Sequence, residues 1–233
     1  MVTFSESTVF NTPAQTLVNT VNCVGAMGTG LALEFRLRYP RMFEDYIERC
    51  ARKNVQLGRP YLYREYEGVW ILNFPTKYHW KMPSKLDWIE RGLNYFVENC
   101  KRADVQSIAF PKLGSGNGGL PWEEVKDLMI KYLSPIPIHV TICLDKMEIA
   151  TGTEGNMVRI VNESSEEELG HILKNRQKQI SSIIDNRPFK RFFTIKELPG
   201  IGQKTYEKLW NFSYSRTISE LAAQPEITQL KLF

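Results

Sequence analysis

Short apolar runs alternate with amphipathic stretches over the first 144 residues, a pattern that predicts strands separated by helices. The apolar runs predict strands over residues 3–10, 16–21, 60–66, 69–74, 107–110 and 138–144. Apolar positions at helical spacing predict helices over residues 31–39, 41–52, 85–100 and 121–133. This order of elements predicts an α/β domain with a mixed sheet.

Turn and cap residues set several of the expected boundaries. Pro40 suits the first position of helix 41–52. Ser84 is expected to cap helix 85–100. A turn at Glu67 and Gly68 would join strands 60–66 and 69–74 as a hairpin. Residues 75–83 have no periodicity and are expected to form a loop.

The pattern weakens after Asp145. Residues 145–162 are expected to add a strand over 157–161 or to form a linker. Residues 162–184 predict one polar helix, whose acidic start suits the positive end of a helix dipole. Residues 190–233 predict a small all-helical unit. We therefore expect a domain over residues 1–150, a connector over 151–189 and a C-terminal module over 190–233.

Composition narrows the class of protein. Hydrophobic residues make up 42% of the 233 positions and charged residues 24%, as in ordinary soluble domains. No apolar run is long enough to predict a membrane span, and the N-terminus does not resemble a secretory signal. The four cysteines form no CxxC pair, which favours free thiols in a cytoplasmic protein over a zinc site or a disulfide framework. We expect no metal and no cofactor.

Charge is concentrated towards the C-terminus. The net charge of the chain is only +4, yet residues 186–216 contain seven basic and two acidic residues. Such a concentration favours a phosphate-bearing partner.

Two glycine-rich segments, residues 22–30 and 113–119, each follow an apolar strand and precede a helix. Ligands of open α/β sheets bind beyond the carboxyl ends of strands, so two such loops could hold a diphosphate through backbone N–H groups. Asn19 and Asn22 add carboxamides that can hydrogen-bond sugar hydroxyls. The alternative is a pair of tight turns that need glycine only for positive φ.

Neither loop has the pattern of two common nucleotide-binding classes. G-x-G-x-x-G in a standard βαβ unit and G-x-x-x-x-G-K-[ST] are both absent, which disfavours a dehydrogenase and a P-loop ATPase.

Both loops resemble the ligand loops of macrodomains, which bind ADP-ribose. The resemblance covers residues 1–145 and implies a three-layer α/β/α fold. It is greatest to the branch that contains DarG, a DNA ADP-ribosyl glycohydrolase, and the human terminal ADP-ribose protein glycohydrolase. The residues that it assigns to ADP-ribose are Asn19, Asn22, Gly25, Met27, Gly28, Thr29, Gly30, Leu31, Pro111, Leu113, Gly114, Ser115, Gly116, Asn117, Gly118 and Gly119.

The same resemblance implies a catalytic lysine. Residues 73–80, Asn-Phe-Pro-Thr-Lys-Tyr-His-Trp, resemble the lysine loop of DarG, so Lys77 is the expected catalytic residue. A neutral Lys77 could attack the anomeric carbon, whereas a charged Lys77 could stabilise the leaving group. The aspartate that the human enzyme also uses would fall near Gly118, where this chain has no acid.

Three neighbours of Lys77 are candidate auxiliary residues. His79 could carry a proton, although a histidine between aromatic residues more often serves packing. Tyr78 and Trp80 could stack on a nucleobase presented to the site, or pack as core residues.

The C-terminal module carries a second resemblance, to helix-hairpin-helix DNA-binding motifs. An apolar helix end, the turn over residues 199–202 and a following helix make up the motif, and residues 217–223 resemble its continuation. Gly200, Ile201, Gly202 and Lys204 could bind a DNA phosphate without reading sequence. The alternative is a helical docking or dimerisation module with the same turn.

Together these features predict a monomeric glycohydrolase that removes ADP-ribose from modified nucleobases in DNA. By resemblance it would act as an antitoxin or in repair, with a cognate ADP-ribosyltransferase toxin as its partner. Two alternatives remain: an ADP-ribose reader without catalysis, and a glycohydrolase acting on modified protein or RNA.

Overall fold

The computed structural model describes residues 1–65 and 68–223. The chain divides into two compact units, one over Met1–Lys146 and one from Met147 onward. None of the described helices is long and apolar enough to cross a membrane. Three expectations reach beyond the described residues: the end of the expected strand 60–66, since Tyr66 is not described; the hairpin turn at Glu67 and Gly68, of which Glu67 is not described; and the end of the C-terminal module, residues 224–233.

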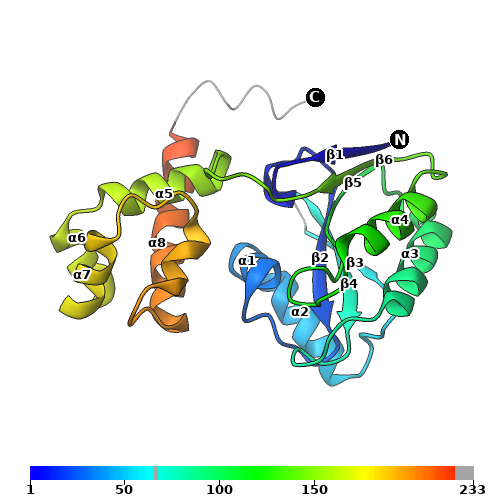
Figure 1. Ribbon diagram of the computed structural model, residues 1–233, viewed down its shortest axis with the longest axis horizontal. Coiled ribbons are helices and arrows are strands. Elements are labelled where there is room, and N and C mark those ends of the chain that lie inside the picture. Colours follow the sequence, from blue (N-terminus) through cyan, green and yellow to red (C-terminus); the bar gives the residue numbers. More distant parts are fainter. Residues whose placement is uncertain (66–67, 224–233) are drawn as a thin grey trace. The chain divides into compact units, whose positions relative to one another are not determined.

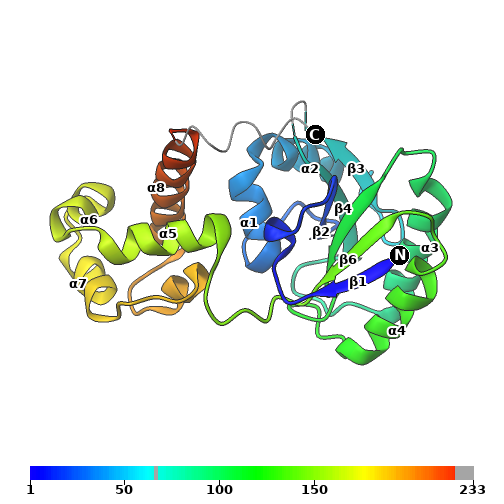
Figure 2. The same cartoon turned by 90° about the horizontal axis from the view of Figure 1, so that it is seen from above.

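The N-terminal unit is built on a six-stranded mixed sheet (Figures 1 and 2). From one edge to the other, its strands are β1 (Val2–Ser5), β6 (His139–Cys143), β5 (Ser107–Pro111), β2 (Thr16–Asn22), β4 (Trp70–Lys77) and β3 (Tyr61–Arg64). Neighbours are parallel except β3 and β4, which form an antiparallel hairpin. The carboxyl ends of the five parallel strands therefore share one edge of the sheet.

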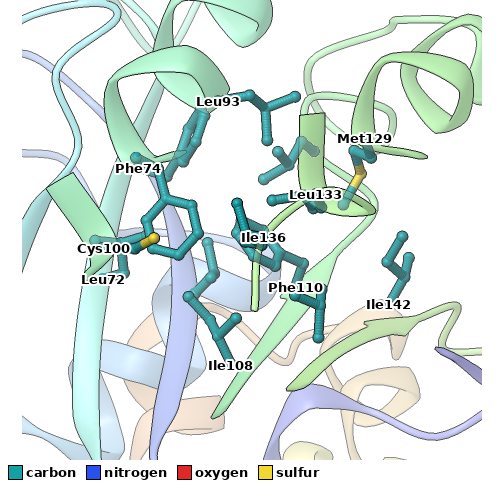
Figure 3. Packing of buried hydrophobic residues seen from close by; sticks show 14 of the residues in the cluster. Leu72, Phe74, Leu93, Cys100, Ile108, Phe110, Met129, Leu133, Ile136 and Ile142 are labelled. Carbon is teal, nitrogen blue, oxygen red and sulfur yellow. The ribbon is translucent and has the colours of Figure 1, made fainter. Parts of the chain in front are cut away.

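Helices cover both faces of this sheet, as Figure 1 shows. α3 (Leu86–Cys100) and α4 (Trp122–Leu133) pack on one face over a core that includes Phe74, Leu93 and Phe110 (Figure 3). The 3₁₀ helix η1 (Val9–Asn11), α1 (Gly30–Arg38) and α2 (Pro40–Ala51) cover the other face over a second core. The expected mixed sheet and three-layer α/β/α architecture are confirmed.

Several expected boundaries in this unit are wrong. The first strand ends at Ser5, and η1 begins at Val9 within the expected run. Ser84 does not cap α3: its side chain is buried behind residue 118, and Lys85 takes the N-cap position. Pro40 does begin α2 as expected.

The most consequential correction concerns β4, which continues through the expected loop as far as Lys77. The ladder with β3 ends at the Tyr61–Asn73 pair, so Pro75 lies beyond it and interrupts no hydrogen bond to β3. On its other side β4 continues to pair with β2, through a bulge that sets Lys77 opposite Asn22. The extension thus fixes Lys77 at a strand end.

The elements of the second unit are all helices among its described residues. Its elements are α5 (Gly152–Glu163), α6 (Glu166–Leu173), α7 (Gln177–Asp185), the 3₁₀ helix η2 (Phe192–Glu197) and α8 (Gln203–Ala222). The expected strand over 157–161 is wrong, because those residues lie in α5 and bury Met157 and Ile160. The expected helix over 162–184 is divided among α5, α6 and α7. Ser165 forms a capping box with Glu168 at the start of α6, and the left-handed backbone of Lys174 ends α6.

The expected connector, residues 151–189, is part of the second unit and does not stand apart from it. α5 packs on α8, and Arg159 of α5 pairs with Glu220 of α8 at 2.5 Å. The expected helix-hairpin-helix pattern is also modified: a 3₁₀ helix precedes the hairpin, and residues 217–222 are the last part of α8.

Candidate functional site

A cavity of about 670 Å³ opens at the carboxyl edge of the sheet, within the size range of small-ligand sites. Both glycine loops and the end of β4 line it. Of the expected site residues, those that line the cavity are Asn22, Gly28, Thr29, Gly30, Leu31, Lys77, Trp80, Pro111, Gly114, Gly116, Asn117 and Gly118. The sequence therefore identified the two loops and the strand end that form most of the wall.

Asn22 holds the shape of the first loop. Its Oδ1 accepts hydrogen bonds from the N–H groups of Val24 and Ala26, and its Nδ2 donates to the carbonyl of Ala26 at 2.6 Å. The buried Tyr46 hydroxyl donates to Asn22 as well. Asn22 thus lines the cavity while its side chain is hydrogen-bonded to the backbone of the first loop.

Several expected contact residues lie outside the cavity wall. Asn19 is fully buried and its Nδ2 donates to Oδ1 of Asn73 on β4 at 2.9 Å, so it joins two strands and does not reach towards a sugar. Met27 and Leu113 are buried in the two cores. The remaining expected residues away from the wall are Gly25, Ser115 and Gly119.

The second loop has no room for a side chain at position 118. A Cβ built on Gly118 would lie 2.3 Å from the carbonyl oxygen of Gly114 and 2.4 Å from Oγ of Ser84. The N–H of Ser84 also donates to the Gly118 carbonyl at 2.9 Å. An aspartate at this position is therefore excluded by packing.

Lys77 connects the parts of the site. It is only 8% exposed, and its Nζ donates to the carbonyl of Asn117 in the second loop at 2.6 Å. The next residue, Tyr78, accepts a hydrogen bond from the N–H of Cys23 in the first loop at 2.9 Å. Burial lowers the pKa of Lys77, which increases the fraction of neutral amine at a given pH.

The two loops also approach each other directly. A Cβ built on Gly30, which has φ +56°, would lie 3.0 Å from Nδ2 of Asn117. Gly30 therefore needs glycine both for its backbone conformation and for the closeness of the second loop.

Aromatic side chains stand beside Lys77 at the cavity. Trp80 lines it and is 55% exposed, and His79 stacks on Trp80 with ring centroids 5.4 Å apart. Tyr78 is 57% exposed and, like His79, does not line the cavity. Nδ1 of His79 accepts the N–H of Lys81 at 3.2 Å, which engages that ring nitrogen in the local turn.

Sequence reasoning missed one end of the cavity. Thr8 and Val9 after β1, Lys112 in the second loop, and Cys143 and Asp145 at the end of β6 all line it. Their position in the sequence could have identified them, because each lies at or just after the end of a parallel strand, and these strands end at the same edge of the sheet. Burial raises the pKa of the Cys143 thiol.

The C-terminal hairpin is fixed by α7. Gln179 donates to the Gly200 carbonyl at 2.8 Å and Ser182 to the Pro199 carbonyl at 3.1 Å. Gly200 has φ +79°, and Gly202, the N-cap of α8, has open space where a Cβ would point. Lys204 is exposed in the first turn of α8.

Much of the positive charge in residues 186–216 is used inside the second unit. Arg191 pairs with Glu154 at 3.0 Å, and Arg216 lies 3.1 Å from Glu168. Burial lowers the pKa of Arg187, whose Nη1 donates to the Ser164 carbonyl. Because some of these basic side chains are paired or buried, the folded unit presents less positive charge than its sequence suggests.

No group of three or more His, Cys, Asp or Glu side chains in residues 1–65 and 68–223 is arranged to hold a metal ion.

Comparison with known proteins places this site in a family. The family model described as the macro domain matches residues 18–129. A DNA ADP-ribosyl glycohydrolase of Thermus aquaticus is 44% identical over 139 residues, which are 58% of this chain and 39% of that protein. A DNA ADP-ribosyl transferase–DNA ADP-ribosyl glycohydrolase fusion protein of Thermosipho africanus is 38% identical over 157 residues, 60% of this chain and 40% of the fusion protein. The chain thus spans about two-fifths of the length of these curated relatives.

Solved structures of DarG proteins also match the N-terminal unit. The macrodomain of Mycobacterium tuberculosis DarG is 39% identical, with a TM-score of 0.59, and the match covers 61% of this chain and 97% of that structure. The structure of Thermosipho africanus DarTG in complex with ADP-ribose is 38% identical, with a TM-score of 0.60, over 61% of this chain and 41% of that one. Through its N-terminal unit, the chain belongs to the macrodomain family, in the branch that contains the DarG macrodomains.

Proposed function

We propose that this protein is a glycohydrolase that removes ADP-ribose from modified nucleobases in DNA. The observation that carries the proposal is a partly desolvated lysine, Lys77, held between two glycine loops at one end of a ligand-sized cavity. Relatives at 38–44% identity whose names state this activity support the choice of reaction.

The loops would bind the diphosphate of ADP-ribose. Residues 28–30 precede and begin α1, where the backbone N–H groups of a helix start and the helix dipole favour an anion. Residues 114–118 face them from the second loop, and Lys112 adds a positive charge. With the diphosphate between the loops, the distal ribose would lie towards Lys77, beside Asn22.

Lys77 would act on the anomeric carbon of that ribose. As a neutral amine it would attack this carbon, the bond to the nucleobase would break, and water would later release the sugar from the lysine. As an ammonium it would instead stabilise charge on the departing base. Its lowered pKa supports the first role, and its hydrogen bond to the Asn117 carbonyl aims Nζ at the second loop in either case.

The second unit would hold the DNA. The start of α8 presents backbone N–H groups next to Gly202, with Lys204 close by, and this combination suits a phosphate. Contacts of this kind position a nucleic acid without reading its sequence. The modified base would be delivered to the cavity of the N-terminal unit from a strand held in this way.

An ADP-ribosyltransferase that modifies DNA is the partner this activity requires. The Thermosipho africanus relative is named as a fusion of such a transferase with a glycohydrolase, which supports an antitoxin role for the present chain. All four cysteines are free thiols, which suits the reducing cytoplasm where both would act.

Incubation with ADP-ribosylated DNA tests the proposal. The wild-type protein should release ADP-ribose, and Lys77→Ala should slow release by at least about a hundredfold. Lys85→Ala, which removes an exposed lysine outside the cavity wall, is the control and should remain active. Tight binding of free ADP-ribose with no release from DNA, protein or RNA would identify a reader. Faster release from modified protein or RNA than from DNA would identify the other alternative substrate.

A further inference from the structure

A short exposed segment, residues 78–82, follows Lys77 at the rim of the cavity. Three of its large side chains are open to solvent: Tyr78 is 57% exposed, Trp80 55% and Met82 46%. Trp80 lines the cavity, whereas Tyr78 and Met82 lie outside its wall. Exposed apolar side chains that gather in this way mark interaction sites, whereas single ones scattered over a surface do not. The segment is therefore a candidate surface for a partner.

Hydrogen bonds hold this segment to both glycine loops. At its start, the Tyr78 carbonyl accepts the N–H of Cys23 in the first loop at 2.9 Å. Just beyond its end, the N–H of Ser84 donates to the Gly118 carbonyl in the second loop at 2.9 Å. Between these two points, a backbone hydrogen bond of 3.0 Å closes a turn over residues 79–82. The exposed side chains thus stand on a backbone that is already fixed, which lowers the entropy cost of binding a partner.

The charge of the segment favours a partner that carries phosphate. No Asp or Glu occurs from residue 68 to residue 86, and the next acid, Asp87, pairs with Arg91 at 3.1 Å. Lys81 is exposed, and its Nζ lies 5.0 Å from the centroid of the Trp80 ring. Aromatic rings next to a basic side chain suit a single nucleic-acid strand, because bases stack on the rings and phosphates attract the charge.

We propose that residues 78–82 bind the nucleotide next to the modified one, with Tyr78 stacking on its base and Lys81 contacting its phosphate. This inference rests on the proposed glycohydrolase function, and it adds a DNA contact on the N-terminal unit to the one proposed for the second unit. With the distal ribose of ADP-ribose at Lys77, the modified base and its strand leave the cavity beside Trp80. Tyr78 then offers an exposed ring to the neighbouring base.

Two substrates separate this contact from the cavity. One is the ADP-ribosylated nucleoside, and the other is a short single-stranded oligonucleotide with the same modified base at its centre. Only the oligonucleotide has neighbouring bases and phosphates, so the full chain should prefer it. Tyr78→Ala should reduce the ratio of the two kcat/KM values by roughly tenfold, as expected for the loss of one stacked base. Tyr78→Phe keeps the ring and should retain the ratio.

Tyr95→Ala is the matched control, because Tyr95 is an exposed tyrosine on α3, outside the cavity wall. This variant should leave the ratio unchanged. Lys81→Ala tests the phosphate contact. It should reduce the slope of log kcat/KM for the oligonucleotide against log salt concentration by about 0.7, the expected loss of one phosphate contact on a single strand.

Three results would overturn the assignment. An unchanged ratio in Tyr78→Ala would exclude the stacking contact and leave the exposed aromatic residues to a protein partner. A loss by the same factor on both substrates would show that Tyr78 acts on the cavity and not on the neighbouring nucleotide. An unchanged salt slope in Lys81→Ala would exclude the phosphate contact. If the wild-type protein releases ADP-ribose from neither substrate, the proposed function itself is wrong and this inference falls with it.

Discussion

At the scale of single residues, Lys77 combines burial with a defined hydrogen bond. It is the last residue of β4, opposite Asn22, and its Nζ donates to the carbonyl of Asn117 in the second loop. Burial disfavours its charged form, so its pKa lies below that of an ordinary lysine. The pH dependence of the reaction can therefore separate the two roles proposed for this residue.

If the neutral amine attacks the sugar, kcat/KM should rise with pH and level off below the ordinary lysine value of about 10.4. Lys77→Arg should then be as inactive as Lys77→Ala, because arginine keeps its proton at any working pH. If the ammonium acts electrostatically, the rate should instead fall as pH rises through the same pKa, and Lys77→Arg should keep measurable activity. Steady-state rates from pH 6 to 10, on a substrate stable over that range, distinguish the two.

Gly118 and Gly116 make a matched pair in the second loop. A Cβ on Gly118 would collide with Gly114 and Ser84, whereas Gly116 has open space around the same position. Gly118→Ala should destabilise the N-terminal unit by about 2 kcal/mol or more, a typical result of overpacking. Gly116→Ala should melt within about 1 °C of the wild-type protein, since exposed substitutions of this kind have small effects. Equal melting temperatures for the two variants would contradict the packing argument.

At the scale of elements, the hairpin between η2 and α8 has the geometry of a phosphate contact but little surrounding charge. Arg187, Arg191 and Arg216 are engaged within the unit. The DNA binding proposed for this element would therefore depend on the helix start and on Lys204, and not on a broad basic surface.

Lys204→Ala should lower DNA affinity and reduce the slope of log Kd against log salt concentration by about one, the expected loss of a single phosphate contact. Fluorescence anisotropy with a labelled oligonucleotide at several salt concentrations measures both quantities. Lys190→Ala, an exposed change outside the hairpin, is the control. A slope that is reduced in Lys190→Ala but not in Lys204→Ala would show that the phosphate contact does not lie at the hairpin.

At the scale of the whole molecule, the tasks proposed for the two units can be tested separately. The N-terminal unit has two cores and the complete cavity within residues 1–146. The solved DarG macrodomain that this chain covers almost completely indicates that such a unit is stable alone. Recognition of ADP-ribose and retention of DNA can therefore be tested apart.

Residues 1–146 expressed alone should bind free ADP-ribose as the full chain does. KM for ADP-ribosylated DNA should rise by at least about tenfold, because the second attachment to the substrate is lost. Calorimetry and initial-rate measurements on the two proteins test this pair of outcomes. An unchanged KM would show that the second unit does not deliver the substrate.

The sequence by itself determined the α/β layers, both glycine loops and the position of Lys77, because these depend on local periodicity, on glycine spacing and on a contiguous motif. Only the tertiary structure decided which of those residues face the cavity. Asn19 turned inward because β4 pairs beside it, and residue 118 must be glycine because Ser84 packs behind the loop. Asp145 joins the cavity only because β6 ends at the same sheet edge as β5 and β2. The basic residues of 186–216 were visible in the sequence. Only the tertiary structure showed that acidic residues of α5, α6 and α8 pair with some of them.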